Sequence, residues 1–139
     1  MRRLFKIING RFYYVSRIRR KIRKPKKISP NYLKYKKEAE ALVKDRLEYF
    51  NKFYNYKWGR VTIRNQKTRW GSCSKKGNLN FNYKIALLDK NQADYIIVHE
   101  LCHLKEFNHS QRFWDLVAIV IPDYKEVRSS LRINGLRLG

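Results

Sequence analysis

The chain has little of several features that would place it in other classes of protein. It holds only two cysteines in 139 residues, too few for a disulfide framework. No apolar run approaches the roughly 20 residues that span a bilayer, and charges interrupt residues 1–16 too often for the apolar core of a signal peptide. These absences predict a soluble protein of the reducing cytoplasm that has no membrane partner.

Acidic residues are also scarce, and none occurs before Glu38. Lysine and arginine number 33 against 11 aspartates and glutamates, so the net charge is +22, and fifteen of the basic residues precede Glu38. The densest stretch, residues 17–27, is typical of an arm that binds nucleic acid in a salt-dependent way. The alternative is a solvated basic face, because net charge describes association and says nothing about a reaction.

Apolar residues nonetheless supply a core. Hydrophobic residues make up 43% of the chain and aromatic residues 14%, which argues against global disorder. The length suits one folded domain. We divide the chain into an N-terminal hairpin and basic arm, residues 1–28, and a folded domain, residues 29–139.

Histidine is rare too, and all three histidines lie within residues 99–109. Residues four apart project from the same face of a helix, so His99 and His103 can bind one metal ion together. Glu100 lies about a quarter-turn around that helix, placed to reach a water on the metal rather than the metal itself. This is the pattern of a zinc hydrolase with a glutamate base, although short motifs also arise by chance on ordinary helices.

A catalytic zinc site needs a third protein ligand, and we predict that it is His109. The helix must end before that residue, so we expect Asn108 to take the left-handed conformation and Ser110 to cap the next helix. Two rivals stay open. Glu106 lies on the same helical face but farther along the axis, and Cys73 would offer a thiolate, which binds zinc well.

Apolar periodicity and turn residues predict the elements around this helix. They are a hairpin with strands at 4–8 and 11–16, a helix at 31–53, strands at 60–64, 69–74 and 79–83, an extended segment at 85–88, and helices at 112–121 and 124–134. Asp89 and Gln92 are a plausible capping box for the metal helix. We therefore expect an α+β fold with helices packed on a short, mostly antiparallel sheet, in which strand 79–83 offers an edge to an extended peptide.

Several separated motifs, taken together with their order along the chain, resemble those of the YgjP-like metallopeptidase domain family, which is related to SprT-like and WLM zinc metalloproteases. The motifs are Lys67-Thr68-Arg69-Trp70-Gly71-Ser72-Cys73-Ser74, His99-Glu100-Leu101-Cys102-His103, Asn108-His109-Ser110, Phe113-Trp114, Pro122-Asp123-Tyr124 and Leu131-Arg132. The resemblance covers roughly residues 30–139. It implies a zincin-like α+β fold with zinc ligands at His99, His103 and His109 and with Glu100 as the base.

The predicted function is zinc-dependent hydrolysis of peptide or protein substrates. Glu100 would take the proton of a zinc-activated water and pass it to the leaving amine, and Arg69 is a candidate donor to the oxyanion. A rival class is a zinc-dependent nuclease, or a phosphoester or nucleotide hydrolase, which the basic arm would suit. The rRNA-maturation endoribonucleases with this histidine spacing lack the glutamate, however. A non-enzymatic zinc protein that binds nucleic acid is the third alternative.

Overall fold

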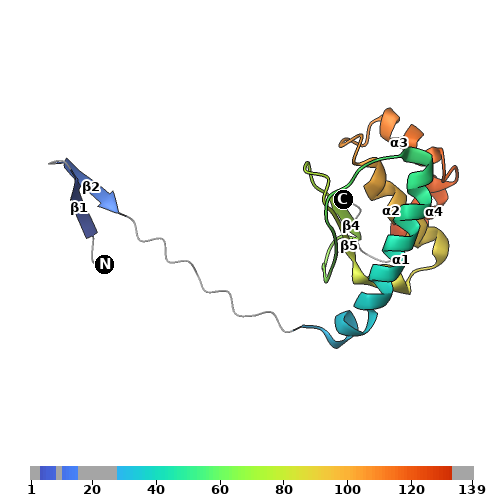
Figure 1. Ribbon diagram of the computed structural model, residues 1–139, viewed down its shortest axis with the longest axis horizontal. Helices are drawn as coiled ribbons and strands as arrows, with labels where there is room; N and C mark the ends of the chain where they lie inside the picture. Colours follow the sequence, from blue (N-terminus) through green and yellow to red (C-terminus); the bar gives the residue numbers. More distant parts are fainter. Residues whose placement is uncertain (1–3, 9–10, 16–27, 133–139) are drawn as a thin grey trace.

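The computed structural model describes residues 4–8, 11–15 and 28–132 (Figure 1). The predicted α+β class is confirmed, with four helices packed on a small sheet. In chain order the elements are β1 (Leu4–Ile8), β2 (Arg11–Val15), α1 (Pro30–Tyr54), β3 (Val61–Arg64), β4 (Gly71–Cys73), β5 (Leu79–Asn82), the 3₁₀ helix η1 (Tyr83–Leu87), α2 (Lys90–Cys102), α3 (Gln111–Ala118) and α4 (Tyr124–Arg132).

The N-terminal hairpin forms as predicted. Strand β1 pairs with β2 in antiparallel register, with Ile8 opposite Arg11. The turn at residues 9–10 and the basic stretch at 17–27 lie outside the described residues. The division of the chain at residue 28 stays a prediction.

Strands β3, β4 and β5 form a three-stranded sheet in the order β3-β5-β4. Strand β5 runs parallel to β3, with Phe81 opposite Ile63, and antiparallel to β4, with Phe81 opposite Gly71. The sheet is therefore mixed, where a mostly antiparallel one was expected. Because β5 is paired on both sides, the prediction that strand 79–83 offers an edge is wrong, and the edges belong to β3 and β4.

Asn82 ends β5 and organises the segments on both sides of it. Its buried side chain accepts a hydrogen bond from the Lys84 backbone N–H at 3.1 Å, which starts η1. Residues 85–88, expected to be extended, therefore begin within a 3₁₀ turn. The Asn82 amide also donates to the carbonyls of Gln66 at 2.8 Å and Arg69 at 2.9 Å. One side chain thus holds the loop that leads into β4.

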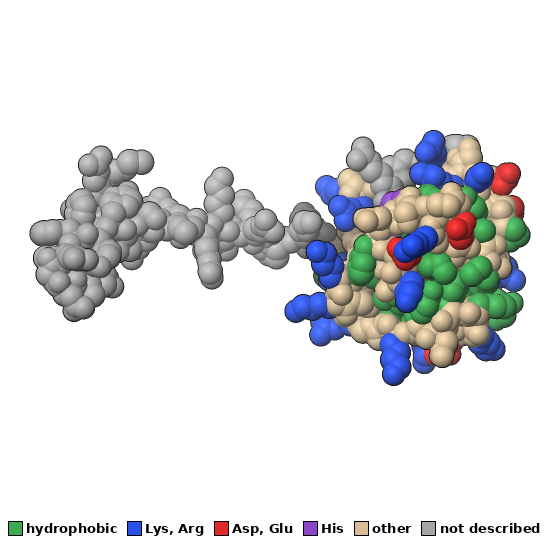
Figure 2. All heavy atoms as spheres, turned by 90° about the horizontal axis from the view of Figure 1, so that it is seen from above, with side chains coloured by type: hydrophobic (Ala, Val, Ile, Leu, Met, Phe, Trp, Pro, Cys, Tyr) green, Lys and Arg blue, Asp and Glu red, His purple; other side chains and the backbone are tan. Residues whose placement is uncertain are grey.

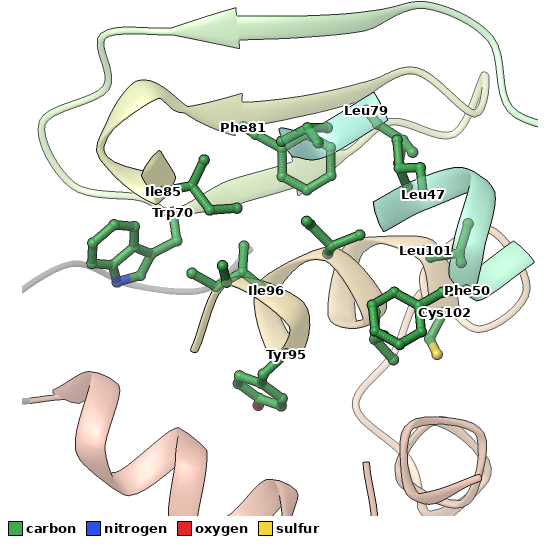
Figure 3. Close-up of a cluster of buried hydrophobic side chains, with 14 of the residues drawn as sticks. Leu47, Phe50, Trp70, Leu79, Phe81, Ile85, Tyr95, Ile96, Leu101 and Cys102 are labelled. Atoms are coloured by element: carbon green, nitrogen blue, oxygen red, sulfur yellow. The ribbon is translucent and has the colours of Figure 1, made fainter. Parts of the chain in front are cut away.

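Helix α2 lies at the centre of the fold, between the sheet and the other helices (Figure 1). Every residue from Tyr95 to Cys102 is buried, because a helix with neighbours on several sides has no solvent face. In Figure 3, Phe81 of the sheet lies above α2, and Leu47 and Phe50 of α1 lie beside it. None of the helices in the described ranges is both long and apolar enough to cross a membrane.

Polar contacts fix the start of α2. The Asp89 carboxylate accepts from the Gln92 backbone N–H at 2.9 Å, as the predicted cap requires. The Gln92 side chain instead donates to Ser130 of α4 at 3.0 Å, so only half of the capping box forms. Arg46 of α1 makes a bidentate pair with Asp94, at 2.6 and 2.8 Å. The first turns of α2 are therefore tied to both α1 and α4.

Candidate metal centre

The last turn of α2 carries the first part of the candidate site. His99 and Glu100 are buried there, and His103 is the first residue after the helix. The chain then tightens, because the backbone N–H groups of residues 105 and 106 both donate to the Cys102 carbonyl, at 3.0 Å each. The helix therefore ends at Cys102, directly before the second histidine.

The expected corner at Asn108 is made differently. Among the described non-glycine residues only Asn55 has a positive φ, so the prediction of a left-handed Asn108 is wrong. The tight turns after Cys102 reverse the chain earlier. Ser110 directly precedes α3, as predicted, but its side chain makes no capping hydrogen bond.

The three imidazoles converge through the same ring atom. The Nε2 atom of His99 lies 3.2 Å from Nε2 of His103 and 3.1 Å from Nε2 of His109. Tetrahedral zinc with Zn–N bonds of about 2.0–2.1 Å places two nitrogen ligands about 3.3 Å apart. Both distances are close to that value, and the candidate ligand atoms of the three rings all lie within 4.8 Å of one another, so the group could hold one metal ion.

A backbone carbonyl determines which ring nitrogen of His103 carries the proton. Its Nδ1 lies 2.9 Å from the carbonyl oxygen of Glu106. A carbonyl can only accept, so Nδ1 carries the proton and the Nε2 of the neutral ring keeps its lone pair for a metal. Glu106 thus contributes its main chain to the centre.

The group of His, Cys, Asp and Glu side chains close enough to hold one ion consists, in the described residues, of His99, His103 and His109. Neither the Glu106 carboxylate nor the Cys73 thiol belongs to it. Burial, together with the nearby Glu100 carboxylate, raises the pKa of Cys73 to about 11. At neutral pH and without a metal, Cys73 is therefore a thiol.

Gly71 leaves the space that the Glu100 carboxylate occupies. A Cβ atom added at Gly71 would lie 2.7 Å from both Cγ and Oε1 of Glu100, closer than real side chains approach. Edge strand β4 therefore meets the candidate base directly, and glycine is required at that contact. Gly71 belongs to the motif at residues 67–74, and no pattern in the sequence indicates this contact with Glu100.

Phe113 of α3 packs against all three imidazoles. Its buried ring stacks on His103, with a centroid distance of 4.5 Å and an interplanar angle of 29°. It is nearly perpendicular to the rings of His99 and His109, each 4.9 Å away. The apolar ring thereby restricts the orientation of the ligand set and excludes water from one side of it.

A second aromatic contact holds the exposed histidine. Trp114 stacks on His109 at a centroid distance of 5.6 Å and an angle of 23°. Tyr124 of α4 stacks in turn on Trp114, at 5.0 Å and 9°, and the Arg128 guanidinium lies 4.9 Å from the centre of the Trp114 ring. His109 is exposed to solvent, but this stack keeps its ring from turning freely. Sequence reasoning noted Phe113 and Trp114 without this role.

The structure thus brings His99, Glu100, His103 and His109 together and leaves Arg69 aside. The Arg69 side chain is exposed, and within the described ranges its guanidinium makes no hydrogen bond or ion pair. Only its backbone carbonyl takes part in the local structure, through Asn82. The expectation that Arg69 stabilises an oxyanion has no support from these contacts.

Comparison with known proteins agrees with this geometry. Residues 12–134 match the family described as YgjP-like, metallopeptidase domain. The chain is 31% identical to the metallopeptidase zymogen abylysin of Pyrococcus abyssi, with a TM-score of 0.61 over 66% of this chain and 93% of abylysin. The metallopeptidase zymogen jannalysin of Methanocaldococcus jannaschii, 23% identical with a TM-score of 0.58 over 66% and 95% of the two chains, shares the fold. No curated protein matches the chain significantly.

Proposed function

Because the chain belongs to the YgjP-like metallopeptidase family, we propose that it is a zinc-dependent peptidase acting on peptides or proteins. His99, His103 and His109 hold the zinc, and Glu100 is the general base. The observation that carries this proposal is the convergence of three Nε2 atoms at 3.1 and 3.2 Å at the end of the helix that bears Glu100. Imidazole nitrogens suit zinc, and three of them leave a fourth position for water.

When bound, zinc lowers the pKa of a water toward 7 and polarises the substrate carbonyl. Glu100 accepts the proton of the attacking water and returns it to the leaving amine. Its carboxylate is fully buried against Gly71, which limits the orientations that it can take. The Nδ1 of His103 faces the Glu106 carbonyl, so its Nε2 is the atom that would bind the metal.

The position of β4 suggests where a substrate would lie. Strand β4 is an edge of the sheet, and its first residue, Gly71, contacts Glu100. An extended peptide that adds to this edge by main-chain hydrogen bonds would bring a peptide bond close to the base. We propose β4 for the role that sequence reasoning gave to strand 79–83.

Replacing Gly71 with alanine is expected to lower kcat/KM for casein about 100-fold, because the new Cβ displaces the Glu100 carboxylate and small misplacements of catalytic groups are that costly. The chain should keep its zinc, since the three atoms nearest to the new Cβ all belong to Glu100 and none to a histidine ligand. Ser72→Ala is the matched control, because Ser72 points away from Glu100. Full activity in Gly71→Ala would show that the contact does not position the base.

The reaction class is tested by offering the purified chain casein, single-stranded DNA, RNA and nucleotides with zinc present. We expect cleavage of casein alone. Since abylysin is a zymogen, the chain is assayed as purified and again after incubation with zinc for long enough to permit self-cleavage. Hydrolysis of RNA or nucleotides with casein left intact would favour the phosphoester hydrolase, and zinc binding without any hydrolysis would favour the non-enzymatic alternative.

Two further parts of the proposal concern the setting of the enzyme. The basic stretch at 17–27 supports an arm that holds the peptidase on nucleic acid by phosphate contacts.

Both cysteines are free thiols, Cys102 buried and Cys73 partly so, which accords with a reducing compartment. We therefore propose a cytoplasmic location.

A further inference from the structure

Charge divides the folded part of the chain by layer. Residues 49–88 contain nine lysines and arginines and no acidic residue. They form the last turn of α1 and the whole three-stranded sheet with its connections. The other described residues of the domain, 28–48 and 89–132, contain 11 basic and 11 acidic residues, a balance of 11 − 11 = 0. The helices are thus nearly neutral, and the sheet layer carries the excess positive charge.

Strand alternation shows which side chains face away from the helices. On β3, Ile63 is buried, whereas Thr62 is partly exposed and Arg64 fully so. The register places Thr62 beside Asn80 and Asn80 beside Ser72, and the Asn80 amide donates to the Ser72 hydroxyl at 3.4 Å. The outer face of the sheet therefore has a row of small, uncharged, polar side chains at its centre.

Exposed cations surround this row. They come from the residue before β3, from β3 itself, from the loop between β3 and β4 and from the turn between β4 and β5, and are Arg60, Arg64, Lys67, Arg69, Lys75 and Lys76. The ion pairs Lys36–Glu40 and Arg46–Asp94 join helical residues and involve none of these six cations. In Figure 2, Lys and Arg side chains lie along the left edge of the folded domain, among other parts of its rim; Figure 1 shows the sheet and the start of α1 on that side.

The chemistry of this face matches a phosphate backbone. Lys and Arg with Ser, Thr and Asn are the side chains that contact phosphate and sugar. A protein partner would be expected to find aromatic or apolar anchors and little lysine, and a single strand would be expected to stack on aromatic rings. The outward-facing residues of the three strands include no aromatic side chain. The features therefore favour a duplex.

We propose that this basic sheet face, the six cations around Thr62, Ser72 and Asn80, binds the phosphate backbone of duplex nucleic acid. The proposal depends neither on peptide hydrolysis nor on the arm. It adds a second polyanion-binding surface, built into the folded domain on the sheet whose strand β4 contacts Glu100. Phosphate contacts carry no sequence information, so binding would be indifferent to base sequence.

The test compares Arg60→Glu/Arg64→Glu with Lys90→Glu/Lys125→Glu in the full chain. Both double variants lower the net charge by four units, but Lys90 and Lys125 are exposed on helices α2 and α4. Binding to a fluorescent DNA duplex is measured by anisotropy at several salt concentrations. We expect the sheet variant to bind at least about tenfold more weakly, and the slope of log affinity against log salt to fall by about 2. The helix variant should keep most of the affinity for the duplex and most of the salt dependence.

Thermal unfolding of each variant is followed so that a folding defect is recognised, and Arg60→Gln/Arg64→Gln replaces the glutamate variant if that one unfolds. Equal losses of affinity in the sheet and helix variants would overturn the proposal, because net charge alone would then explain binding. Displacement of the duplex by polyglutamate as effectively as by unlabelled duplex would overturn it in favour of an acidic protein. Tighter binding of single strands than of duplex would contradict the choice of a duplex.

Discussion

Replacing Glu100 with glutamine is expected to lower kcat/KM for casein by about 100- to 10,000-fold, the usual contribution of a general base, while the chain keeps its zinc. Glutamine has nearly the same shape as glutamate, so it fills the space beside Gly71, but its amide cannot take a proton from water. Casein hydrolysis and zinc content are measured on the same preparation. Retained zinc with lost hydrolysis separates the role of a base from that of a ligand.

Asp115→Asn is the matched control, because it makes the same carboxylate-to-amide change on an exposed position of α3, where Asp115 accepts a hydrogen bond from Gln111. This control should cleave casein as the unmodified chain does. Full activity in Glu100→Gln would remove Glu100 from the mechanism. Loss of zinc together with activity would instead make Glu100 a ligand or a structural support of the centre.

Removing the third imidazole is the other change from which we expect a large effect. His109→Ala should weaken zinc binding by more than the 10- to 100-fold that loss of a second-shell partner typically costs, because it deletes one of only three protein ligands. Affinity is measured by competition with a chromogenic chelator. Casein hydrolysis should fall at limiting zinc for the same reason.

Cys73→Ala is the companion variant for the third ligand, since Cys73 was the rival from a distant part of the chain. Its thiol lies near the Glu100 carboxylate, which helps to raise its pKa to about 11, and it is not among the side chains that share the centre. Zinc affinity should therefore be unchanged in Cys73→Ala. Unchanged affinity in His109→Ala, with a loss in Cys73→Ala, would transfer the role to the thiolate.

The features that could be predicted from sequence are those that local spacing determines. The four-residue interval between His99 and His103 requires only helical geometry, and the cap at Asp89 acts within three residues. The apolar periodicity that predicts a helix at 31–53 likewise matches the buried residues of α1, Ala39, Val43, Leu47 and Phe50. Each depends on neighbours along the chain, so each was predictable.

The corner after α2 was not predictable in this way. A left-handed Asn108 was the local solution, but the helix ends at Cys102 and the His103 ring bonds to the Glu106 carbonyl. Phe113, from the next helix, packs against the same His103 ring. Tertiary packing rather than turn propensity therefore determines where the helix stops and how His109 returns.

The order of the strands in the sheet could not be predicted from local sequence patterns for a similar reason. Alternation identifies which residues form β3, β4 and β5, but their neighbours depend on how the connections cross the sheet. The central position of β5 made the proposed edge wrong. The same arrangement places Gly71 of β4 against Glu100. The sequence shows that residues 49–88 contain no acidic residue. Only the strand register, however, shows that their cations surround the outer face of the sheet.

The most direct test of the three-histidine centre is X-ray absorption at the zinc edge of the zinc-loaded full chain. We expect about one zinc per chain, with three imidazole nitrogens and one oxygen donor at about 2.0–2.1 Å and no sulfur. The same spectrum is expected from Glu100→Gln, because a base is not a ligand. A sulfur donor at about 2.3 Å, or a spectrum with only two imidazoles, would contradict the centre formed by His99, His103 and His109.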